Sequence, residues 1–416
     1  MSTHAQGDAI KLLTFNLWGL KYVSKQRHER IAAFARKLRC DPDYDVVALQ
    51  EIWTDEDWKS IVDLCREVYP YTRRFSSGIL TGPGLAILSK VPIKRTFLYR
   101  FPVNGTPAAF YRGDWYVGKS VAVTLLEPLS EGASPVAVLN SHMHAPYALT
   151  GSSAYACVRA CQAWDIASVA QTYSEAGYAV ILVGDLNSRP GSLPYRIMQS
   201  EAGLTDSWEE IHGLTDADKL RQMTPEDQIK LGGATCDSTL NTWRADRRPD
   251  EACRLDYALI DNTRLRALDA SVQFTERVPG VGSFSDHFAY SATFKVLPKS
   301  NTLLSRPSKS QRLEIYQELT DLVAEYLSSR NSWQSRLLLL HFWLSAFVFV
   351  AFLAVIVVVS FVAPWASILF LFFGGLVLAT GLLSGQIGFL FCRSERRAMT
   401  EIILQVADAA RVLQDR

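Results

Sequence analysis

The feature that most constrains the fold of this chain is a long stretch without charge near the C-terminus. No Asp, Glu, Lys or Arg occurs from Leu337 to Cys392. As a single helix this stretch would be about 84 Å long at ~1.5 Å per residue, whereas the hydrocarbon core of a bilayer is ~30 Å thick. Pro364 interrupts the stretch near its middle. This pattern predicts two membrane-spanning helices, about 337–363 and 366–391, joined by a tight turn. A buried hairpin within a soluble protein is the alternative.

Arginines at both ends of this stretch predict how it is oriented. Arg330 and Arg336 precede the first predicted span, and the connecting turn carries no charge. The residues that follow the second span include Arg393, Arg396 and Arg397. Because basic residues favour the cytosolic side, both termini are expected in the cytosol. The chain is therefore predicted to be a multi-pass integral membrane protein of the endoplasmic reticulum or another intracellular membrane.

The chain before the uncharged stretch alternates between strand-like and helix-like segments. Residues 10–15 and 46–49 are mostly apolar and strand-like, whereas residues 27–38 have apolar side chains at helical spacing. This alternation predicts an α/β domain with helices on two faces. The predicted organisation is an α/β domain over residues 1–297, a linker and amphipathic juxtamembrane helix over 298–336, the two spans within 337–392, and a cytosolic amphipathic helix over 393–416.

Composition excludes some function classes. The formal net charge is +1, from 43 Lys and Arg against 42 Asp and Glu, so a nucleic-acid partner is not expected. The seven cysteines are odd in number and lack the paired spacing of a zinc site, which indicates reduced thiols. Because the net charge is close to zero, any anionic partner is expected to bind at a local group of residues.

One strand carries the strongest local indication of a functional site. An apolar run over residues 179–183 reaches Gly184 and then presents Asp185 and Asn187 shortly before Pro190. If the chain stays extended there, the two polar side chains point to the same side and converge on one spot. This pair suits the binding of a water or a phosphate oxygen. A turn rich in Asp and Asn at the strand end is the alternative.

Other polar residues also follow predicted strands, and together they suit phosphoester chemistry. Glu51, helped by Asn16, is expected to hold Mg²⁺, which binds few protein carboxylates and keeps several waters. His287 is expected to act as general base because histidine titrates near neutral pH, with Asp256 orienting its ring. Asp185 and Asn187 are expected to position the water, and His142 to donate a hydrogen bond or proton. Asp286 completes the predicted set as a residue that contacts the site residues and not the substrate.

These residues occur in an order that resembles the deoxyribonuclease-I-like endonuclease/exonuclease/phosphatase superfamily. The matching motifs are Asn16, Leu49-Gln50-Glu51, Ser141-His142, Gly184-Asp185-Leu186-Asn187, Leu255-Asp256-Tyr257 and Ser285-Asp286-His287. The resemblance spans about residues 10–296. It implies a four-layer sandwich of two mixed β-sheets flanked by helices, with Mg²⁺-dependent phosphoester hydrolysis at the strand ends.

Within that superfamily the chain is similar to the neutral sphingomyelinases and the fungal inositol phosphosphingolipid phospholipases C. The similarity lies in residues 113–119 (GDWYVGK), residues 142–145 (HMHA) and the C-terminal hairpin. It implies that Asp114 and Lys119 form a pair that gates the site, for which an ordinary exposed ion pair is the alternative. The implied reaction is attack of water on phosphorus. It releases ceramide and a phosphorylated headgroup from sphingomyelin, inositol phosphosphingolipids or both.

Other functions remain open from the sequence. An inositol polyphosphate phosphatase or a nuclease of the same superfamily would use similar residues, but neither explains the hairpin, and the near-neutral charge disfavours a nuclease. A catalytically inactive membrane scaffold is an alternative of a different class. Contacts from the loops over residues 205–250 are expected to decide between phosphocholine and phosphoinositol headgroups.

Two features of the membrane region predict partners besides the sphingolipid substrate. Arginines near an anionic surface contribute ~1 kcal/mol each, so anionic phospholipid is expected to activate the protein. Gly381 and Gly385 have the spacing of close helix contacts. This spacing predicts either packing within the hairpin or a homodimer.

Overall fold

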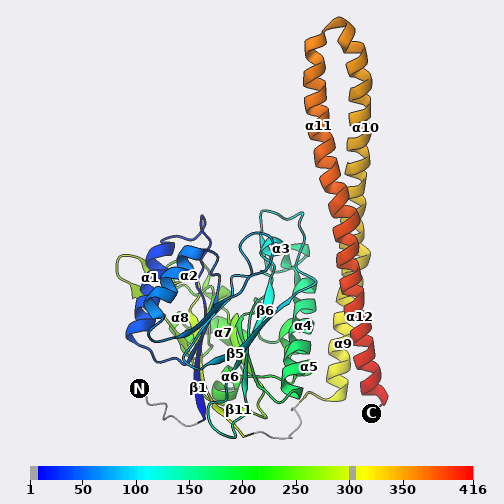
Figure 1. Ribbon diagram of the computed structural model, residues 1–416. Helices are drawn as coiled ribbons and strands as arrows, with labels where there is room; N and C mark the ends of the chain where they lie inside the picture. Colours follow the sequence, from blue (N-terminus) through cyan, green and yellow to red (C-terminus); the bar gives the residue numbers. More distant parts are fainter. Residues whose placement is uncertain (1–7, 215, 299–305, 416) are drawn as a thin grey trace. The chain divides into compact units, whose positions relative to one another are not determined.

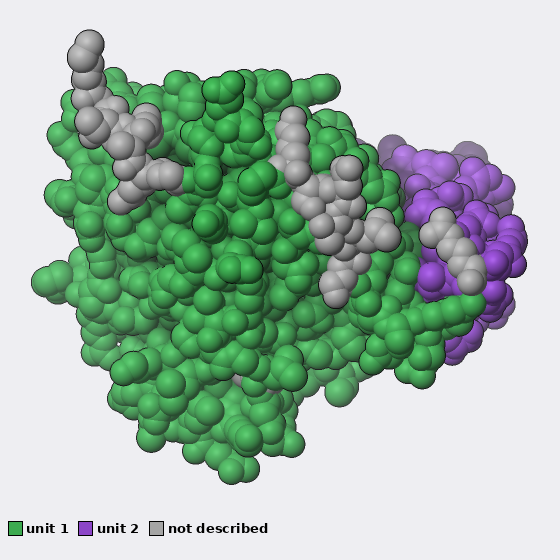
Figure 2. Space-filling model, turned by 90° about the horizontal axis from the view of Figure 1, so that it is seen from below, with its two compact units in different colours: residues 1–105, 112–315 green, residues 106–111, 316–416 purple. Residues whose placement is uncertain are grey.

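The computed structural model of the chain describes residues 8–214, 216–298 and 306–415 and divides into two units (Figure 1). Figure 2 colours the first unit, residues 1–105 and 112–315, green and the second, residues 106–111 and 316–416, purple. Part of the predicted linker, residues 299–305, lies outside the described residues. Each unit is described separately below.

The first unit is built on two six-stranded mixed sheets. The first sheet has the order β11 (Leu265–Gln273), β14 (Ala289–Val296), β1 (Ala9–Asn16), β2 (Val46–Gln50), β4 (Ala86–Ser89) and β3 (Tyr71–Arg74). The second has the order β5 (Ile93–Arg100), β6 (Ser120–Leu126), β7 (Val136–His142), β8 (Ala179–Asp185), β10 (Asp256–Ile260) and β9 (Thr205–Asp206). The pairs β1–β2 and β7–β8 are parallel, and the other pairs within the two sheets are antiparallel.

Helices flank the two sheets, as the sequence predicted. α1 (Arg27–Cys40) and α2 (Asp55–Cys65) pack on the first sheet, and α4 (Ala156–Glu175) lies against β8 and α5 (Leu193–Ala202). Shorter elements are α3 (Asp114–Val117), α6 (Ser207–His212), α7 (Ala217–Gln222), α8 (Pro225–Lys230) and the ribbon β12 (Arg277–Val278) with β13 (Gly282–Ser283). The prediction of two mixed sheets flanked by helices is confirmed.

Alternation along the strands creates two hydrophobic cores. Leu12 and Val46 of the first sheet share a buried cluster with Val138 and Ile181 of the second, so this core lies between the sheets. The opposite face of the first sheet buries Leu13, Phe15, Val47 and Leu49 against Ile31, Phe34 and Ile61 of α1 and α2. Because successive side chains of a strand point to opposite faces, one strand contributes to both cores.

A close backbone approach fixes the end of β8. Gly184 has φ 128°, and a Cβ added there would lie 1.9 Å from the carbonyl oxygen of Ser141 on β7. The parallel ladder pairs these two residues, and the next pair along is His142 with Asp185. The absence of a side chain at Gly184 therefore allows β7 and β8 to approach closely, so that His142 and Asp185 lie side by side at the strand ends.

We expect Gly184→Ala to lower the free energy of unfolding by more than about 4 kcal/mol, because a backbone clash is added to an unfavourable φ. Gly177→Ala is the matched control, since Gly177 has φ 89° but open space around its Cβ position. The control should lose only the left-handed cost of ~1–2 kcal/mol. Denaturant unfolding of both purified variants measures the difference. Equal losses would contradict the role of the close approach.

A polar bridge joins the two sheets beneath the strand ends. Gln50 Nε2 on β2 donates to Asn140 Oδ1 on β7 at 2.8 Å, and Asn140 Nδ2 donates to the carbonyl oxygens of Leu49 and Ala86, each at 3.1 Å. All these groups are buried. Because buried polar groups must be hydrogen-bonded, this bridge holds the carboxyl ends of β2 and β7 in register across the core.

The second unit contains the apolar hairpin. Its helices are α9 (Lys309–Tyr326), which enters the unit at Tyr316, α10 (Ser332–Val362), α11 (Pro364–Gln386) and α12 (Cys392–Asp415), with π-helical turns at Leu327–Asn331 and Ile387–Phe391. The chain reverses at Ala363, and α10 and α11 run side by side (Figure 1). By length and composition both helices suit crossing a membrane, which confirms the predicted hairpin.

Small residues bring α10 and α11 together. A Cβ added to Gly381 would lie 2.3 Å from Cβ of Ser345, and one added to Gly385 would lie 3.0 Å from the Phe342 ring. Both glycines therefore serve contact within the hairpin, which was one of the two roles predicted for them.

A buried carboxylate closes the base of the hairpin, outside the predicted spans. Glu395 accepts hydrogen bonds from Tyr326 OH at 3.1 Å and from Asn331 Nδ2 at 2.9 Å. Arg396 Nη2 donates to Asn331 Oδ1 at 3.1 Å. Burial raises the pKa of Glu395 from 4.5 to about 7, against the lowering effect of these two donors.

The raised pKa of Glu395 makes stability depend on pH. The folded state keeps a proton that the unfolded state releases above pH 4.5, so stability falls as pH rises from there through about 7. The loss is about 3 kcal/mol, at ~1.4 kcal/mol per pKa unit. Glu395→Gln should flatten the thermal-unfolding profile between pH 5 and 8, whereas the exposed Glu401→Gln on the same helix should not. Matching profiles for the two variants would contradict the assignment.

Candidate active site

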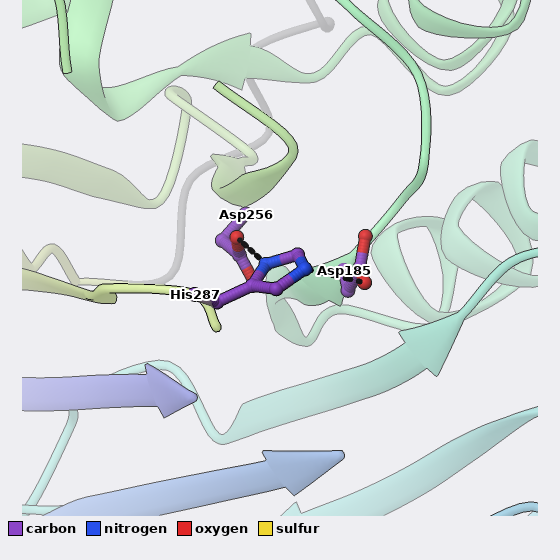
Figure 3. A group of neighbouring side chains, drawn as sticks. All are labelled: Asp185, Asp256 and His287. Atoms are coloured by element: carbon purple, nitrogen blue, oxygen red, sulfur yellow. Dashed lines mark hydrogen bonds and ion pairs between the residues drawn. The ribbon is translucent and has the colours of Figure 1, made fainter. Parts of the chain in front are cut away.

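The predicted polar residues meet at one edge of the two sheets in the first unit. The parallel pair β1–β2 sets Asn16 opposite Gln50, and β8 sets Asp185 opposite both His142 of β7 and Asp256 of β10. Figure 3 shows Asp185, Asp256 and His287 with their polar atoms directed toward one another. The ladders thus bring together residues that are far apart in the sequence.

Asp185 is the centre of this group. Its Oδ2 accepts a hydrogen bond from Asn16 Nδ2 at 3.0 Å and lies 3.5 Å from His142 Nε2 and 3.8 Å from His287 Nε2. Its Oδ1 accepts from the backbone N–H of Asn187 at 3.0 Å. Burial and the neighbouring Asp256 raise the pKa of Asp185 to about 6, although His287 opposes this shift.

His287 is paired with Asp256. Nδ1 of His287 lies 2.8 Å from Asp256 Oδ2, and both side chains are buried. Desolvation would lower the pKa of His287, but Cys236, Asp256 and Asp185 together raise it well above 6.5. With Nδ1–H donating to Asp256, Nε2 is the atom that can take up a proton on the side of Asp185.

His142 is held in its neutral form. Burial, together with Lys119 and His287, lowers its pKa well below 6.5. Nε2 faces Asp185, whereas the buried Nδ1 has no hydrogen-bond partner among the described residues. A neutral imidazole offers one N–H, so His142 can donate a hydrogen bond at neutral pH.

The predicted metal ligands lie beside this cluster. Glu51 Oε1 accepts from Asn16 Nδ2 at 3.0 Å and Oε2 accepts from Trp53 Nε1 at 3.3 Å. Burial and then the charge of Asp286 raise the pKa of Glu51. A cation would favour its ionised form, and the local excess of carboxylates supplies the oxygen ligands of a hard divalent metal.

A second group of residues could also hold a metal ion. Ligand atoms of Asp185, Asp256 and His287 all lie within 4.8 Å of one another. These residues were expected to position and activate water, and Glu51 is not among them. The residues of the site therefore fit a divalent metal. They form two adjacent groups of donors, Glu51 with Asn16 and the group of Asp185, Asp256 and His287.

Left-handed backbone marks the same region. Trp18, Glu51 and Asn187 have φ of 47°, 60° and 45°. Such conformations cost ~1–3 kcal/mol for non-glycine residues and gather at functional sites. They occur here one or two residues after the ends of β1, β2 and β8, where each changes the direction of the chain.

Asp114 and Lys119 form a buried ion pair next to the cluster. Lys119 Nζ lies 3.4 Å from Asp114 Oδ1, and the two side chains are only 3% and 6% exposed, so the exposed-pair alternative is wrong. Burial would raise the pKa of Asp114, but Lys119 and His144 lower it. Lys119 Nζ and Asn187 Nδ2 both donate to the carbonyl oxygen of Met143, at 3.3 and 3.0 Å. The pair is therefore linked to Asn187 through one backbone group.

Sequence reasoning missed one charged residue of the site. Arg244 Nη2 donates to Asp286 Oδ2 at 2.5 Å, and its Nε lies 3.6 Å from Asp237. Arg244 belongs to a polar segment without periodicity, where only long-range contacts determine which side chain faces the site. Its neighbour Trp243 lies against Trp18, with ring centroids 5.7 Å apart.

Comparisons with known proteins agree with this geometry. Residues 13–287 match the sequence model of the Endonuclease/Exonuclease/phosphatase family. The Saccharomyces cerevisiae protein named inositol phosphosphingolipids phospholipase C is 50% identical over 448 residues, covering 100% of this chain and 93% of its own. The Schizosaccharomyces pombe protein of that name is 34% identical, covering 96% and 94%. A putative neutral sphingomyelinase of Caenorhabditis elegans is 32% identical, covering 69% and 67%.

Two solved structures share the fold of the first unit. Beta toxin from Staphylococcus aureus superposes with a TM-score of 0.52 at 20% identity, over 68% of this chain and 99% of its own. Sphingomyelinase C from Streptomyces griseocarneus gives 0.50 at 19% identity, over 68% and 99%. At these identities the likeness establishes the fold alone.

Proposed function

This chain belongs to the endonuclease/exonuclease/phosphatase family, and we propose that it is a membrane-anchored phospholipase C that hydrolyses phosphosphingolipids to ceramide and a phosphorylated headgroup. The observation that carries the proposal is the buried Asp256–His287 pair directed at Asp185, in a chain whose 50% identity to the yeast phospholipase extends along its whole length. That length includes the hairpin, which a soluble phosphatase or nuclease would not need.

Mg²⁺ is the cofactor we assign to the site. Glu51 would hold it, helped by Asn16, whose Nδ2 donates to the Glu51 carboxylate, because a carboxylate suits a small hard cation that keeps several waters. The ion would supply charge neutralisation at the phosphoryl oxygens as negative charge develops there. Asp286, held by Arg244, lies close enough for its charge to raise the pKa of Glu51, and a bound cation would relieve this repulsion.

The other residues of the site transfer a proton, orient the attacking water or donate a hydrogen bond in this proposal. His287 Nε2 removes a proton from the attacking water, while Asp256 fixes the ring and stabilises the imidazolium. Asp185 and Asn187 orient that water toward phosphorus. As the new P–O bond forms, the bond to the ceramide oxygen breaks, and neutral His142 donates a hydrogen bond to a phosphate oxygen or to the leaving alkoxide, which takes its proton from solvent. The products are ceramide and the phosphorylated headgroup.

Asp114 and Lys119 act in this proposal as a gate beside the attacking water. Separating the ion pair would free Lys119 Nζ near Met143, whose carbonyl oxygen also holds Asn187. A phosphate oxygen is a fitting new partner for the ammonium group. Asp114 would in turn keep its hydrogen bond from Tyr147 OH.

The membrane region is proposed to place the enzyme on its substrate. α10 and α11 span an intracellular membrane such as that of the endoplasmic reticulum, with both termini and the first unit in the cytosol. Anionic phospholipid near the five arginines at the hairpin base activates hydrolysis. A homodimer formed through other hairpin surfaces fits the same arrangement, and nucleic acid is not a partner.

The test is ceramide release from labelled inositol phosphoceramide and sphingomyelin in vesicles containing Mg²⁺ and anionic phospholipid. We expect release from inositol phosphoceramide in preference to sphingomyelin, as the name of the yeast relative suggests, and loss of both signals with EDTA. Absence of ceramide from both lipids, with a folded protein, would refute the proposal. Phosphatase and nuclease substrates, and then a scaffold role, would be tested next.

A further inference from the structure

A short uncharged segment of the chain groups with the hairpin rather than with the sheets that flank it in sequence. Residues 106–111 (TPAAFY) belong to the second unit. Phe110 is 74% exposed and Tyr111 is 72% exposed, and their rings lie 5.7 Å apart. An exposed aromatic pair on an uncharged segment indicates an interaction surface.

The start of this segment is fixed to α10. Gln334 Nε2 donates to Thr106 Oγ1 at 3.0 Å, and Thr106 is 6% exposed. The same hydroxyl accepts from the backbone N–H of Ala108 at 3.3 Å, and Ala109 N–H donates to the Thr106 carbonyl at 3.1 Å. The turn that presents Phe110 is therefore ordered and tied to a known level of the helix.

The turn of α10 around Gln334 is where the chain enters the membrane in the proposed arrangement. Gln334 precedes Leu337, where the uncharged stretch begins, by three residues, or about 4.5 Å along the helix axis. Trp333, 65% exposed, and Arg336 lie in the same turn. Aromatic and basic side chains at the end of a span occupy the headgroup region of a bilayer.

We propose that Phe110 and Tyr111 insert into the headgroup layer of the leaflet in which α10 begins, so that segment 106–111 is a second membrane contact beside the hairpin. This inference rests on the proposed insertion of the hairpin. A lipid surface is the partner that fits, because the segment carries no charge to select a protein or nucleic acid and lies level with the membrane entry.

Quenching of a site-specific fluorophore tests the inference without using enzyme activity. The exposed Cys40 is replaced by Ser, and single cysteines are introduced in the full chain as Phe110→Cys, Leu214→Cys and Leu353→Cys. Leu214 is an 87% exposed residue of the first unit, and Leu353 lies within α10. Each variant is labelled with a nitrobenzoxadiazole dye and reconstituted into vesicles that contain either headgroup-nitroxide or tail-brominated phosphatidylcholine.

We expect headgroup nitroxide to quench the label at position 110 roughly twofold or more, because aromatic side chains of this belt lie at headgroup depth. The label at 214 should be unaffected, and tail bromines should quench the label at 353. Quenching at 353 without quenching at 110 would overturn the inference while leaving the anchoring intact. No quenching at 353 would overturn the membrane anchoring, and the inference with it.

Discussion

His287→Ala is expected to lower kcat by at least ~100-fold, which is the usual effect of losing a general base. Nε2 of His287 is the basic nitrogen directed toward Asp185, and Asp256 holds Nδ1 at 2.8 Å. Without the ring, the cluster loses the imidazole that we propose takes the proton of the attacking water. Ceramide release by the purified variant measures the effect, and its thermal unfolding checks that it is folded.

The pH profile distinguishes a base from a structural residue. A base works only when deprotonated, and the carboxylates raise the pKa of His287, so the rate should rise with pH and reach half its maximum above pH 6.5. Asp256→Asn removes one of these charges and should move that midpoint to lower pH while slowing the reaction. His28→Ala, at a side chain 65% exposed, is the matched control and should change neither. A near-normal rate for His287→Ala would place the site elsewhere.

Glu51→Gln is expected to raise the Mg²⁺ concentration needed for half-maximal activity by ~100-fold or more, since loss of even a group behind the metal ligands costs 10–100-fold. Gln keeps the size and one oxygen of Glu but removes the charge. We expect Mg²⁺ to raise the melting temperature of the natural chain, because a ligand stabilises only the state that binds it, and the same change should abolish this rise. Titration of both properties measures the effect.

The controls for this prediction separate the two candidate metal positions. Glu56→Gln, at an exposed residue of α2, should leave the Mg²⁺ response unchanged. If the ion instead binds at Asp185, Asp256 and His287, Glu51→Gln will keep the response and Asp256→Asn will lose it. That pattern would contradict the assignment of Glu51 as metal ligand.

The parts of the fold that follow from local pattern were predictable. Alternation in β1 and β2 places successive side chains in the two cores, and a glycine before Asp185 marks the end of β8. Because the carboxyl ends of β1 and β2, and of β7 and β8, lie together in parallel pairs, polar residues at those ends converge. The helical hairpin was likewise predictable from the uncharged stretch that begins at Leu337, because only helices and closed barrels can span a bilayer.

What the sequence did not reveal depends on contacts between distant residues. Arg244 lies in a polar loop, and nothing in its neighbours shows that it meets Asp286. The burial of Lys119 and Asp114 was equally invisible, because charged residues are usually exposed and only the surrounding fold removes them from water. Glu395 and Thr106 also gain their roles from packing that no local periodicity encodes.

The most direct test of the central claim is hydrolysis of inositol phosphoceramide by the protein in ¹⁸O-labelled water with Mg²⁺. Attack of water on phosphorus predicts that ¹⁸O enters the inositol phosphate, that ceramide is released unlabelled, and that EDTA stops both. Label in ceramide, or release of ceramide 1-phosphate, would show that a different bond is broken and would contradict the account.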